Sequence, residues 1–274
     1  MPELPEAENI GNALKRVLPG KTITAVEVFS PAMRSSLEPL KTAGLAGKSF
    51  LDIRRRGRYL IADLSDGRGL LMHFGMSGVV RVEPPGIPRR KHEHIFIHLS
   101  DGKIFRFECT RRFSLLEIHT LSGPERMPEK LKSLGPEPFS DDFNSKNLLR
   151  QASGKTTPVK TFIMDNAVVT GIGNIYASET LFAARIHPVR PVKTLSVEEW
   201  DLIISNARSI LKKAIAAGGS SISDFLNVDG SEGKFAQELK VYGQMGRPCP
   251  VCGNLIECIK IGGRSSCFCP ECQK

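Results

Sequence analysis

Four cysteines near the C-terminal end place the strongest constraint on how this chain folds. Cys249-Pro-Val-Cys252 and Cys269-Pro-Glu-Cys272 form two C-x-x-C pairs separated by 16 residues. This spacing is typical of a structural zinc site, in which two knuckles supply four thiolates at the corners of a tetrahedron. Residues 236–274 are too poor in apolar side chains to fold without a bound metal ion of this kind. We therefore expect one zinc ion, Zn2+, that folds this module rather than catalyses.

The other cysteines do not form a second set of this kind. Six of the seven cysteines lie in the last 26 residues, and in a chain without a secretory signal metal ligation is favoured over disulfides. Cys258 and Cys267 lie between the two pairs, and Cys267 is the one plausible rival ligand. Cys109 is predicted to be a core or strand residue.

The segment between the two pairs carries Gly262-Gly263-Arg264-Ser265. Adjacent glycines suit a hairpin tip, and an arginine beside them would present its guanidinium to a phosphate. A formal net charge of +9 and a sequence pI of about 9.3 also favour a polyanionic partner. No apolar run approaches the roughly 20 residues of a membrane-spanning helix, so the expected compartment is the cytoplasm.

The first half of the chain is predicted to be antiparallel β structure after one early helix. Asp66-Gly67 and Asp101-Gly102 each separate two apolar stretches, which is the strongest short signal for a β-hairpin. The predicted helix covers residues 5–18, and the predicted strands lie within residues 21–29, 49–64, 69–82, 95–99 and 103–107.

The second half changes to helical spacing. Ser196 and Glu199 form a capping box at the start of its clearest helix, and Gly218 is placed to end that helix. A linker with a short helical stretch precedes this half, and a loop rich in Gly, Ser and Asp follows it. The predicted segments are the linker 121–158, the helices 159–164, 174–185 and 196–217, and the loop 218–236.

Gly171 and Gly173 stand just before a predicted helix that starts near Asn174. Backbone N–H groups at such a helix start would suit a phosphate, and the Asn174 side chain could add a contact. A dinucleotide-binding fingerprint is a poor alternative, because the third glycine is absent and no βαβ unit surrounds the motif. Two helices joined by this loop instead indicate a relative of the helix–turn–helix.

The N-terminus offers an unusual nucleophile. A small second residue permits removal of Met1, which leaves a secondary amine on Pro2. An α-amino group with a pKa of about 7.7–8.0 is partly unprotonated at neutral pH, and a secondary amine can form an iminium with a sugar C1′. Glu3 could then transfer protons. If Met1 is retained, the amine is blocked and this chemistry is lost.

Together with the rest of the chain, this segment resembles the formamidopyrimidine-DNA glycosylase family, whose other main branch is endonuclease VIII. The matching pieces occur in the family's order along the whole chain, at residues 2–6, 73–78, 91–94, 111–113, 134–138, 164–166, 171–181 and 235–239 and in the two cysteine pairs.

The resemblance implies an α+β fold of two domains, an N-terminal antiparallel β-sandwich with flanking helices and a C-terminal helix–two-turn–helix domain with a zinc finger. Residues 1–131 would form the catalytic domain, 132–235 the helix–two-turn–helix domain with a lesion-capping loop, and 236–274 the four-cysteine zinc finger. Double-stranded DNA with oxidised bases or abasic sites would run between the domains of a monomeric, nucleoid-associated bacterial enzyme. The implied activity is excision of oxidised purines (8-oxoguanine, formamidopyrimidines), followed by β,δ-elimination.

The same resemblance assigns roles to individual residues. Pro2 is the nucleophile, Glu3 the acid/base, and Glu6 helps to hold the terminal segment. In the family, three side chains fill the gap left by the flipped nucleotide, here Met76, Arg111 and Phe113. Apolar wedges stabilise an opened duplex, and plain core positions are the alternative for the methionine and the phenylalanine. The positions that match phosphate contacts are His73, His92, Arg112, Lys160, Asn174 and Arg264.

The sequence departs from the family at Arg58, where a lysine is usual. Arginine keeps the positive charge but does not readily donate a proton, which puts a catalytic role of Arg58 and full activity on 8-oxoguanine in doubt. Residues 108–110 read Glu-Cys-Thr where relatives more often carry Asp-Pro. A second metal site at 92–94 is disfavoured by strand alternation. The open alternatives are an endonuclease VIII-like enzyme for oxidised pyrimidines, a catalytically impaired damage-binding protein and a zinc-ribbon scaffold.

Overall fold

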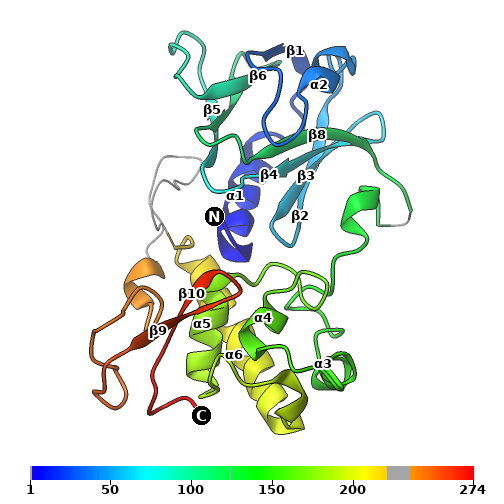
Figure 1. Cartoon of the computed structure of the whole chain (residues 1–274). Helices are drawn as coiled ribbons and strands as arrows, with labels where there is room; N and C mark the ends of the chain where they lie inside the picture. The colour runs from blue at the N-terminus through cyan, green and yellow to red at the C-terminus, as the bar shows by residue number, and fades with distance from the viewer. Residues whose placement is uncertain (1, 124, 221–234) are drawn as a thin grey trace. The chain divides into compact units, whose positions relative to one another are not determined.

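The computed structural model of the chain describes residues 2–123, 125–220 and 235–274, and it forms two compact units (Figure 1). The first unit contains the described residues up to Lys132 together with 218–220. The second contains Ser133–Ala217 and the described residues from 235 onward, so the four-cysteine module shares a unit with the helices before it. None of the helices in the described ranges is long and apolar enough to span a membrane.

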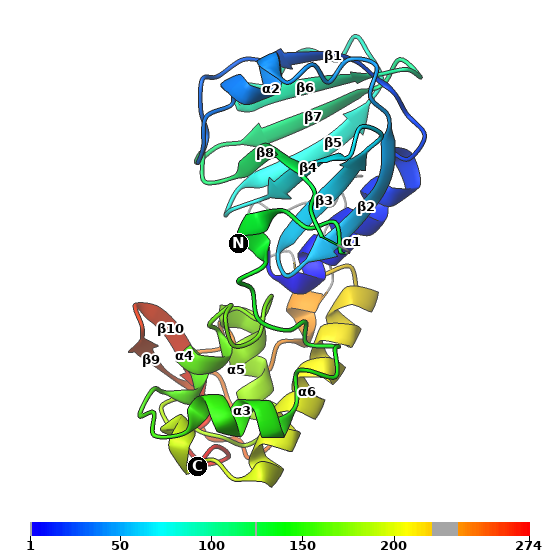
Figure 2. The same cartoon turned by 90° about the vertical axis from the view of Figure 1, so that its right-hand side faces the viewer.

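The first unit is built on two four-stranded antiparallel sheets (Figure 2). Their strand orders are β1-β6-β7-β5 and β2-β3-β4-β8. Both sheets and the first helix contribute buried apolar side chains to one core, among them Leu14, Phe50 and Phe105. The sheets therefore pack face to face as the predicted sandwich. The strands are β1 (Ile23–Val28), β2 (Phe50–Arg56), β3 (Tyr59–Leu64), β4 (Arg68–His73), β5 (Gly78–Glu83), β6 (Glu93–Leu99), β7 (Ile104–Cys109) and β8 (Leu115–Thr120).

Both predicted hairpins are confirmed. Gly67 connects β3 to β4 with a φ of 84°, and Gly102 connects β6 to β7 with a φ of 82°. These left-handed conformations explain why glycine follows aspartate at both turns.

The strands differ from the sequence prediction in three places: two predicted stretches are broken, and one strand was not predicted. The stretch 49–64 is broken at Gly57, whose φ of 57° turns the chain from β2 into β3. The stretch 69–82 is broken between β4 and β5, which belong to different sheets. β8 was not predicted, although it completes one of the two sheets by pairing with β4.

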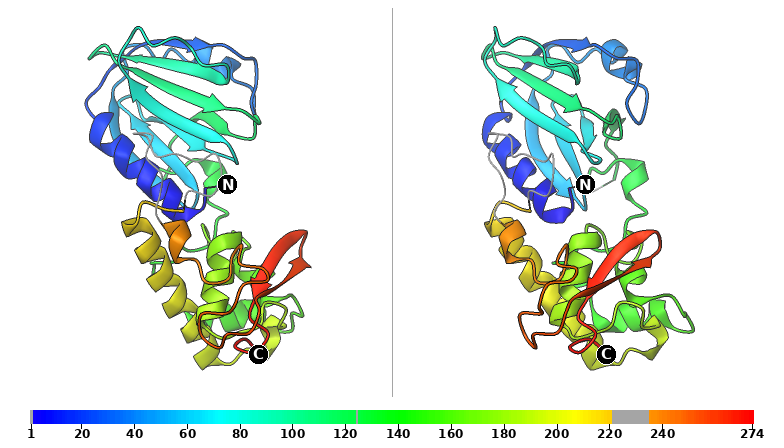
Figure 3. Two further views of the ribbon diagram at one scale, coloured as in Figure 1. Left: turned by 90° about the vertical axis from the view of Figure 1, so that its left-hand side faces the viewer. Right: turned by 60° about the vertical axis from the view of Figure 1, so that its left-hand side comes forward.

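Two helices accompany the sheets, α1 (Leu4–Val17) and α2 (Glu38–Thr42). α1 lies against β2 and β3 (Figure 3). It buries Ile10 and Leu14 against the sandwich core, as the apolar spacing of residues 5–18 predicts. The N-terminal segment is thereby fixed to the β-sheets.

The second unit is mainly helical. Its longest helix, α6, begins with the predicted capping box, because the Ser196 hydroxyl accepts from the Glu199 N–H at 3.2 Å and the Glu199 carboxylate accepts from the Ser196 N–H at 3.0 Å. The elements of this unit are α3 (Ser145–Ala152), α4 (Val159–Ile163), α5 (Asn174–Ala183), α6 (Val197–Ala216), β9 (Glu257–Ile261) and β10 (Arg264–Phe268). Short 3-10 turns cover Val192–Thr194 and Phe235–Glu238 in this unit and Glu129–Leu131 in the first unit.

Candidate functional site

The N-terminal segment with the predicted nucleophile is buried where α1 begins. Pro2, Glu3 and Glu6 are all buried. Glu6 Oε2 accepts from the backbone N–H of Glu3 at 2.9 Å, which satisfies a donor that the helix start leaves open. Its Oε1 accepts from the N–H and the hydroxyl of Ser220 at 2.8 and 2.9 Å. One carboxylate thus fixes both the Glu3 backbone and Ser220. Residues 221–234, which follow Ser220 and belong to the predicted lesion-capping loop, lie outside the described residues.

His73, a predicted phosphate contact, is the last residue of β4 and packs against Tyr59, with ring centroids 4.8 Å apart and the ring planes tilted by 42°. The Gly75 N–H donates to His73 Nδ1 at 3.2 Å, so the proton of the neutral ring lies on Nε2. Burial, and then the positive charges of Arg34 and Arg58, lowers the pKa of His73 to about 4. His73 is therefore an uncharged hydrogen-bond donor near neutral pH.

Arg58 follows Gly57 in the turn between β2 and β3, and its side chain is buried. Its charge contributes to the lowered pKa of His73, so the two side chains share one electrostatic environment. A guanidinium holds a permanent charge there and does not readily act as a proton donor.

Two neighbouring loops of the first unit carry the predicted gap-filling side chains. Met76 is 43% exposed and Phe113 56% exposed, which rules out the plain core positions considered as their alternative. A Cβ added to Gly75 would lie 2.6 Å from the Phe113 carbonyl oxygen, and the Arg111 N–H donates to the Ser77 hydroxyl at 3.1 Å. The loops are therefore in close backbone contact, and Met76, Arg111 and Phe113 are all exposed on them.

The remaining predicted contacts of the first unit lie nearby. Arg112 is exposed and adopts a φ of 56°, a left-handed conformation that is uncommon outside glycine. His92 is half-buried. His94 points inward, where Nε2 bonds the Cys109 carbonyl at 2.9 Å and Nδ1 bonds the Ser30 hydroxyl at 2.8 Å. Its ring nitrogens are thus engaged in packing the sheet.

In the second unit, Lys160 of α4 lies at the centre of a buried polar cluster. Its side chain is 1% exposed, and Nζ donates to Asn174 Oδ1 at 2.7 Å, to the Ser265 carbonyl at 3.1 Å and to the Ser266 hydroxyl at 2.7 Å. An ammonium group has three protons, and these acceptors engage them. Because Lys160 binds Oδ1 of Asn174, the amide NH2 of this half-buried side chain faces the other way.

Arg264 is exposed at the first position of β10. Gly262 and Gly263 before it adopt φ values of 55° and 74°, so the predicted hairpin tip is confirmed. An open pocket of about 440 Å³ lies beside the tip and is lined in part by Arg264, Lys155 and Thr161. Arg264, Asn174 and the Lys160 cluster therefore belong to one face built from α4, α5 and the hairpin.

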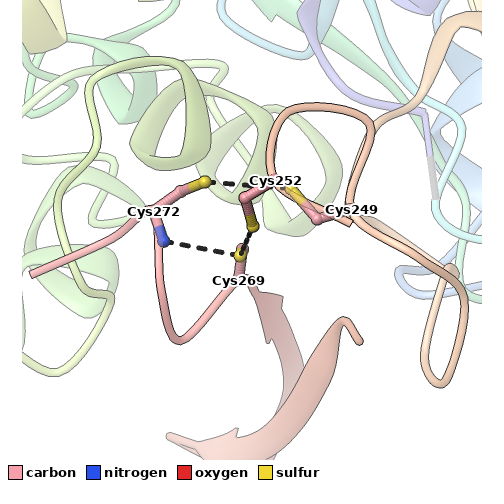
Figure 4. Close-up of side chains that lie close together, drawn as sticks. All are labelled: Cys249, Cys252, Cys269 and Cys272. Carbon is pink, nitrogen blue, oxygen red and sulfur yellow. Dashed lines mark hydrogen bonds between the residues drawn. The ribbon is translucent and has the colours of Figure 1, made fainter. Parts of the chain in front are cut away.

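The four cysteines of the two C-x-x-C pairs converge (Figure 4). Their sulfur atoms all lie within 4.8 Å of one another, with Cys249–Cys272 at 3.9 Å and Cys252–Cys269 at 3.4 Å. Four sulfurs bonded to zinc at about 2.3 Å would be about 3.8 Å apart. The donor set and spacing thus fit one structural zinc ion, and within the described ranges this is the one such group of His, Cys, Asp and Glu side chains.

Cys267 is not a rival ligand, because it forms a disulfide with Cys258 across the β9–β10 hairpin. The expectation that the distribution of the cysteines argues against disulfides is therefore wrong for this pair. The disulfide forms because the strand register places Cys258 and Cys267 directly opposite each other.

A further buried carboxylate, not singled out from the sequence, joins the zinc module to α5. Glu179 accepts from the N–H groups of Lys240, Val241 and Tyr242 at 2.8 to 3.0 Å. Burial raises the pKa of Glu179, whereas these backbone hydrogen bonds lower it. No local sequence signal reveals this role, because the partners follow some 60 residues later.

Family models match almost the whole chain. The formamidopyrimidine-DNA glycosylase N-terminal domain matches residues 1–116, and the H2TH domain of the same glycosylase matches residues 134–226. The formamidopyrimidine-DNA glycosylase of Laribacter hongkongensis is 42% identical over 274 residues, with both chains covered completely. That of Legionella pneumophila is 45% identical and is covered to 98%. This chain belongs to the formamidopyrimidine-DNA glycosylase family.

Solved structures agree with this family. A complex of a Lactococcus lactis FPG mutant with Fapy-dG-containing DNA aligns over both complete chains, with a TM-score of 0.91 at 36% identity. A complex of Lactococcus lactis Fpg with abasic-site DNA covers 99% of each chain, with a TM-score of 0.90 at 35% identity. The zinc finger found in FPG and IleRS matches residues 246–274. In this formamidopyrimidine-DNA glycosylase family member, the α+β fold and the structural zinc finger are therefore as predicted.

Proposed function

We propose that this DNA glycosylase of base excision repair excises oxidised purines and then cuts the DNA strand at the resulting abasic site. Full-length membership of the family carries the proposal. The Lactococcus relative has been solved with Fapy-dG and with abasic-site DNA. This chain retains Pro2, Glu3 and Glu6, and Glu6 is bonded to the Glu3 backbone. The substrate is double-stranded DNA with oxidised purines or abasic sites.

The proposed chemistry starts from the Pro2 amine after removal of Met1. Its lone pair attacks C1′, the C1′–N bond to the base breaks, and the base leaves with that electron pair and a proton. Glu3 protonates the sugar ring oxygen, and the ring opens to an iminium between Pro2 and C1′. Loss of a C2′ proton expels the 3′ phosphate, and a second elimination expels the 5′ phosphate.

The two units supply different parts of the proposed DNA contact. Met76, Arg111 and Phe113 fill the gap in the duplex, which offsets the few kcal/mol of unstacking. The phosphate backbone is contacted by His73, His92, Arg112, Asn174 and Arg264, with Lys160 setting the Asn174 side chain. His73 donates from Nε2 as a neutral ring, since its pKa is about 4. Arg58 supplies a fixed positive charge rather than a proton.

Borohydride trapping tests this proposal on protein whose N-terminus is shown by mass spectrometry to be Pro2. The duplexes carry 8-oxoguanine opposite cytosine, a formamidopyrimidine, or an oxidised pyrimidine. A covalent adduct is expected with the two purine lesions, and none with protein that retains Met1. Glu3→Gln should slow excision by roughly 100-fold or more, whereas Glu38→Gln, an exposed carboxylate on α2, should not.

Two results would overturn the proposal. Damage-selective binding without an adduct or strand cleavage on any duplex would identify a catalytically impaired binder. An adduct formed with the oxidised pyrimidine alone would identify an endonuclease VIII-like specificity.

A further inference from the structure

The β9–β10 hairpin contains two cysteines that the zinc site does not use. Cys258 and Cys267 are paired in the strand register, their Cα atoms are 4.0 Å apart, and they form a disulfide. The bond closes a short loop, since the two residues are nine positions apart in sequence. That loop contains the glycine tip and Arg264.

The position of this disulfide links the zinc site to the predicted phosphate contacts. Cys269, a zinc ligand, follows Cys267 by two residues. On the other side, Ser265 and Ser266 are hydrogen-bonded to Lys160. β10 is thus fastened by zinc at one end, by Lys160 near the other, and by the disulfide between them.

Two observations indicate that this disulfide can be reduced and re-formed rather than being a permanent structural bond. The hairpin has other supports, because zinc, the strand pairing and Lys160 hold it in place, so the pair can be reduced without unfolding the module. Cys258 is half-buried while Cys267 is 6% exposed, so Cys258 is the more accessible residue of the two. Disulfides in reducing compartments are mostly transient or redox-sensing.

We propose that Cys258 and Cys267 are a redox-active pair whose oxidation fastens the DNA-contacting hairpin and slows the loss of zinc. The oxidant is a low-molecular-weight disulfide. The Cys258 thiolate attacks one of its sulfurs, breaks the S–S bond and releases one thiol. The Cys267 thiolate then attacks Cys258 Sγ and releases the second thiol, so two electrons leave the protein and the two cysteine protons end on the released thiols.

The consequence for DNA rests on the proposed function. Oxidising conditions that damage guanine would also close this pair. The enzyme would then hold Arg264 most firmly when its substrate is most abundant. Reduction would make the hairpin less rigid and lower the affinity for the duplex, and it would leave the Pro2 nucleophile unchanged.

Thiol counting on the zinc-loaded full-length protein tests the chemistry. The protein is equilibrated in mixtures of reduced and oxidised glutathione, alkylated and analysed by peptide mass spectrometry. Two thiols, Cys258 and Cys267, should disappear together as the oxidised fraction rises, while one equivalent of zinc is retained. Zinc loss before this pair closes, or a pair that stays reduced in every mixture, overturns the proposal.

The rate of zinc release to a chromogenic chelator tests whether the disulfide slows the loss of zinc. Closing so short a loop shifts the opening equilibrium by at most roughly 100-fold, so release should be about tenfold slower from the oxidised than from the reduced protein. The double variant Cys258→Val and Cys267→Val should release zinc at one rate in both conditions. Equal rates for the original protein, or a redox dependence that persists in the double variant, would contradict the proposal.

Binding to a duplex with a tetrahydrofuran abasic-site analogue tests the link to DNA. Affinity at fixed salt should be severalfold higher for the oxidised protein, and should not depend on redox state in the double variant. Equal affinity in both states overturns the DNA part of the inference. Absence of binding in either state would instead contradict the proposed function, and the thiol and zinc measurements would still decide on the pair.

Discussion

The two units hold their predicted DNA-contacting side chains in different ways. In the β unit, Met76 and Phe113 stand exposed on loops whose spacing is set by backbone contact at Gly75. In the helical unit, Asn174 and Arg264 depend on hydrogen bonds of a buried side chain to residues that are far apart in the sequence. Lys160, for example, binds the backbone of Ser265, 105 residues later. The loops of the first unit are therefore held by close backbone contact, whereas the face of the second depends on a buried side chain and is sensitive to the loss of single groups.

Removal of the zinc site should have the largest effect, and it should disrupt the second unit while leaving the first intact. Cys269→Ala removes one ligand, and structural zinc contributes about 10–16 kcal/mol in small modules. We expect loss of zinc, loss of the hairpin that carries Arg264 and a fall in DNA affinity of roughly 100-fold or more. Metal analysis and titration of labelled DNA at fixed salt measure this. Hydrogen exchange of the sandwich strands should not change, and faster exchange throughout β2–β4 would show that the units do not fail separately.

Lys160→Met should have the next largest effect. It leaves Asn174 Oδ1 and the Ser266 hydroxyl without their buried donor, at a cost of about 4 kcal/mol. Denaturant unfolding with a probe in the second unit measures it. Lys212→Met is the matched control, because that lysine is exposed on α6 of the same unit. Equal destabilisation by both substitutions would refute the holding role of Lys160.

Gly75→Ala tests the backbone contact in the first unit. The added Cβ meets the Phe113 carbonyl oxygen at 2.6 Å at a φ of 57°, so we expect a loss of roughly 3–4 kcal/mol and weaker filling of the DNA gap. Gly86→Ala is the control, since its φ is 87° but no atom lies within 4 Å. That change should cost only about 1 kcal/mol, and thermal unfolding of both variants separates steric contact from backbone conformation.

The smallest effect concerns pH in the first unit. His73 has a pKa of about 4 when folded and 6.5 when unfolded, so between these values the unfolded chain binds a proton that the folded chain does not. Stability is fully present above pH 6.5 and falls by up to about 3 kcal/mol as the pH drops to 4. Unfolding free energies between pH 7.5 and 4 should show this slope, and His73→Gln should flatten it. An unchanged slope in the variant would assign the effect to other groups.

These contrasts also explain what the sequence could predict. Features coded by neighbouring residues were predicted correctly, such as the Asp66-Gly67 turn, the capping box of α6 and the zinc spacing. The break at Gly57 was missed because Arg56-Gly57-Arg58 lacks the Asp-Gly or Asn-Gly pair that marks a hairpin turn. The disulfide of Cys258 with Cys267 was missed because it depends on strand register. The burial of Lys160 was missed because its partners lie on two other elements, α5 and β10, that are distant in the sequence. The DNA contacts of individual residues remain predictions.

Glu179 attaches the start of the zinc module to α5 in a way that depends little on the residues it holds. Its carboxylate accepts from the backbone N–H groups of Lys240, Val241 and Tyr242, and every residue except proline supplies such a group. The attachment therefore tolerates exchange of these three residues for others that are not proline, but it does not tolerate exchange of Glu179. Variation among relatives can accumulate at 240–242 while this connection to α5 persists.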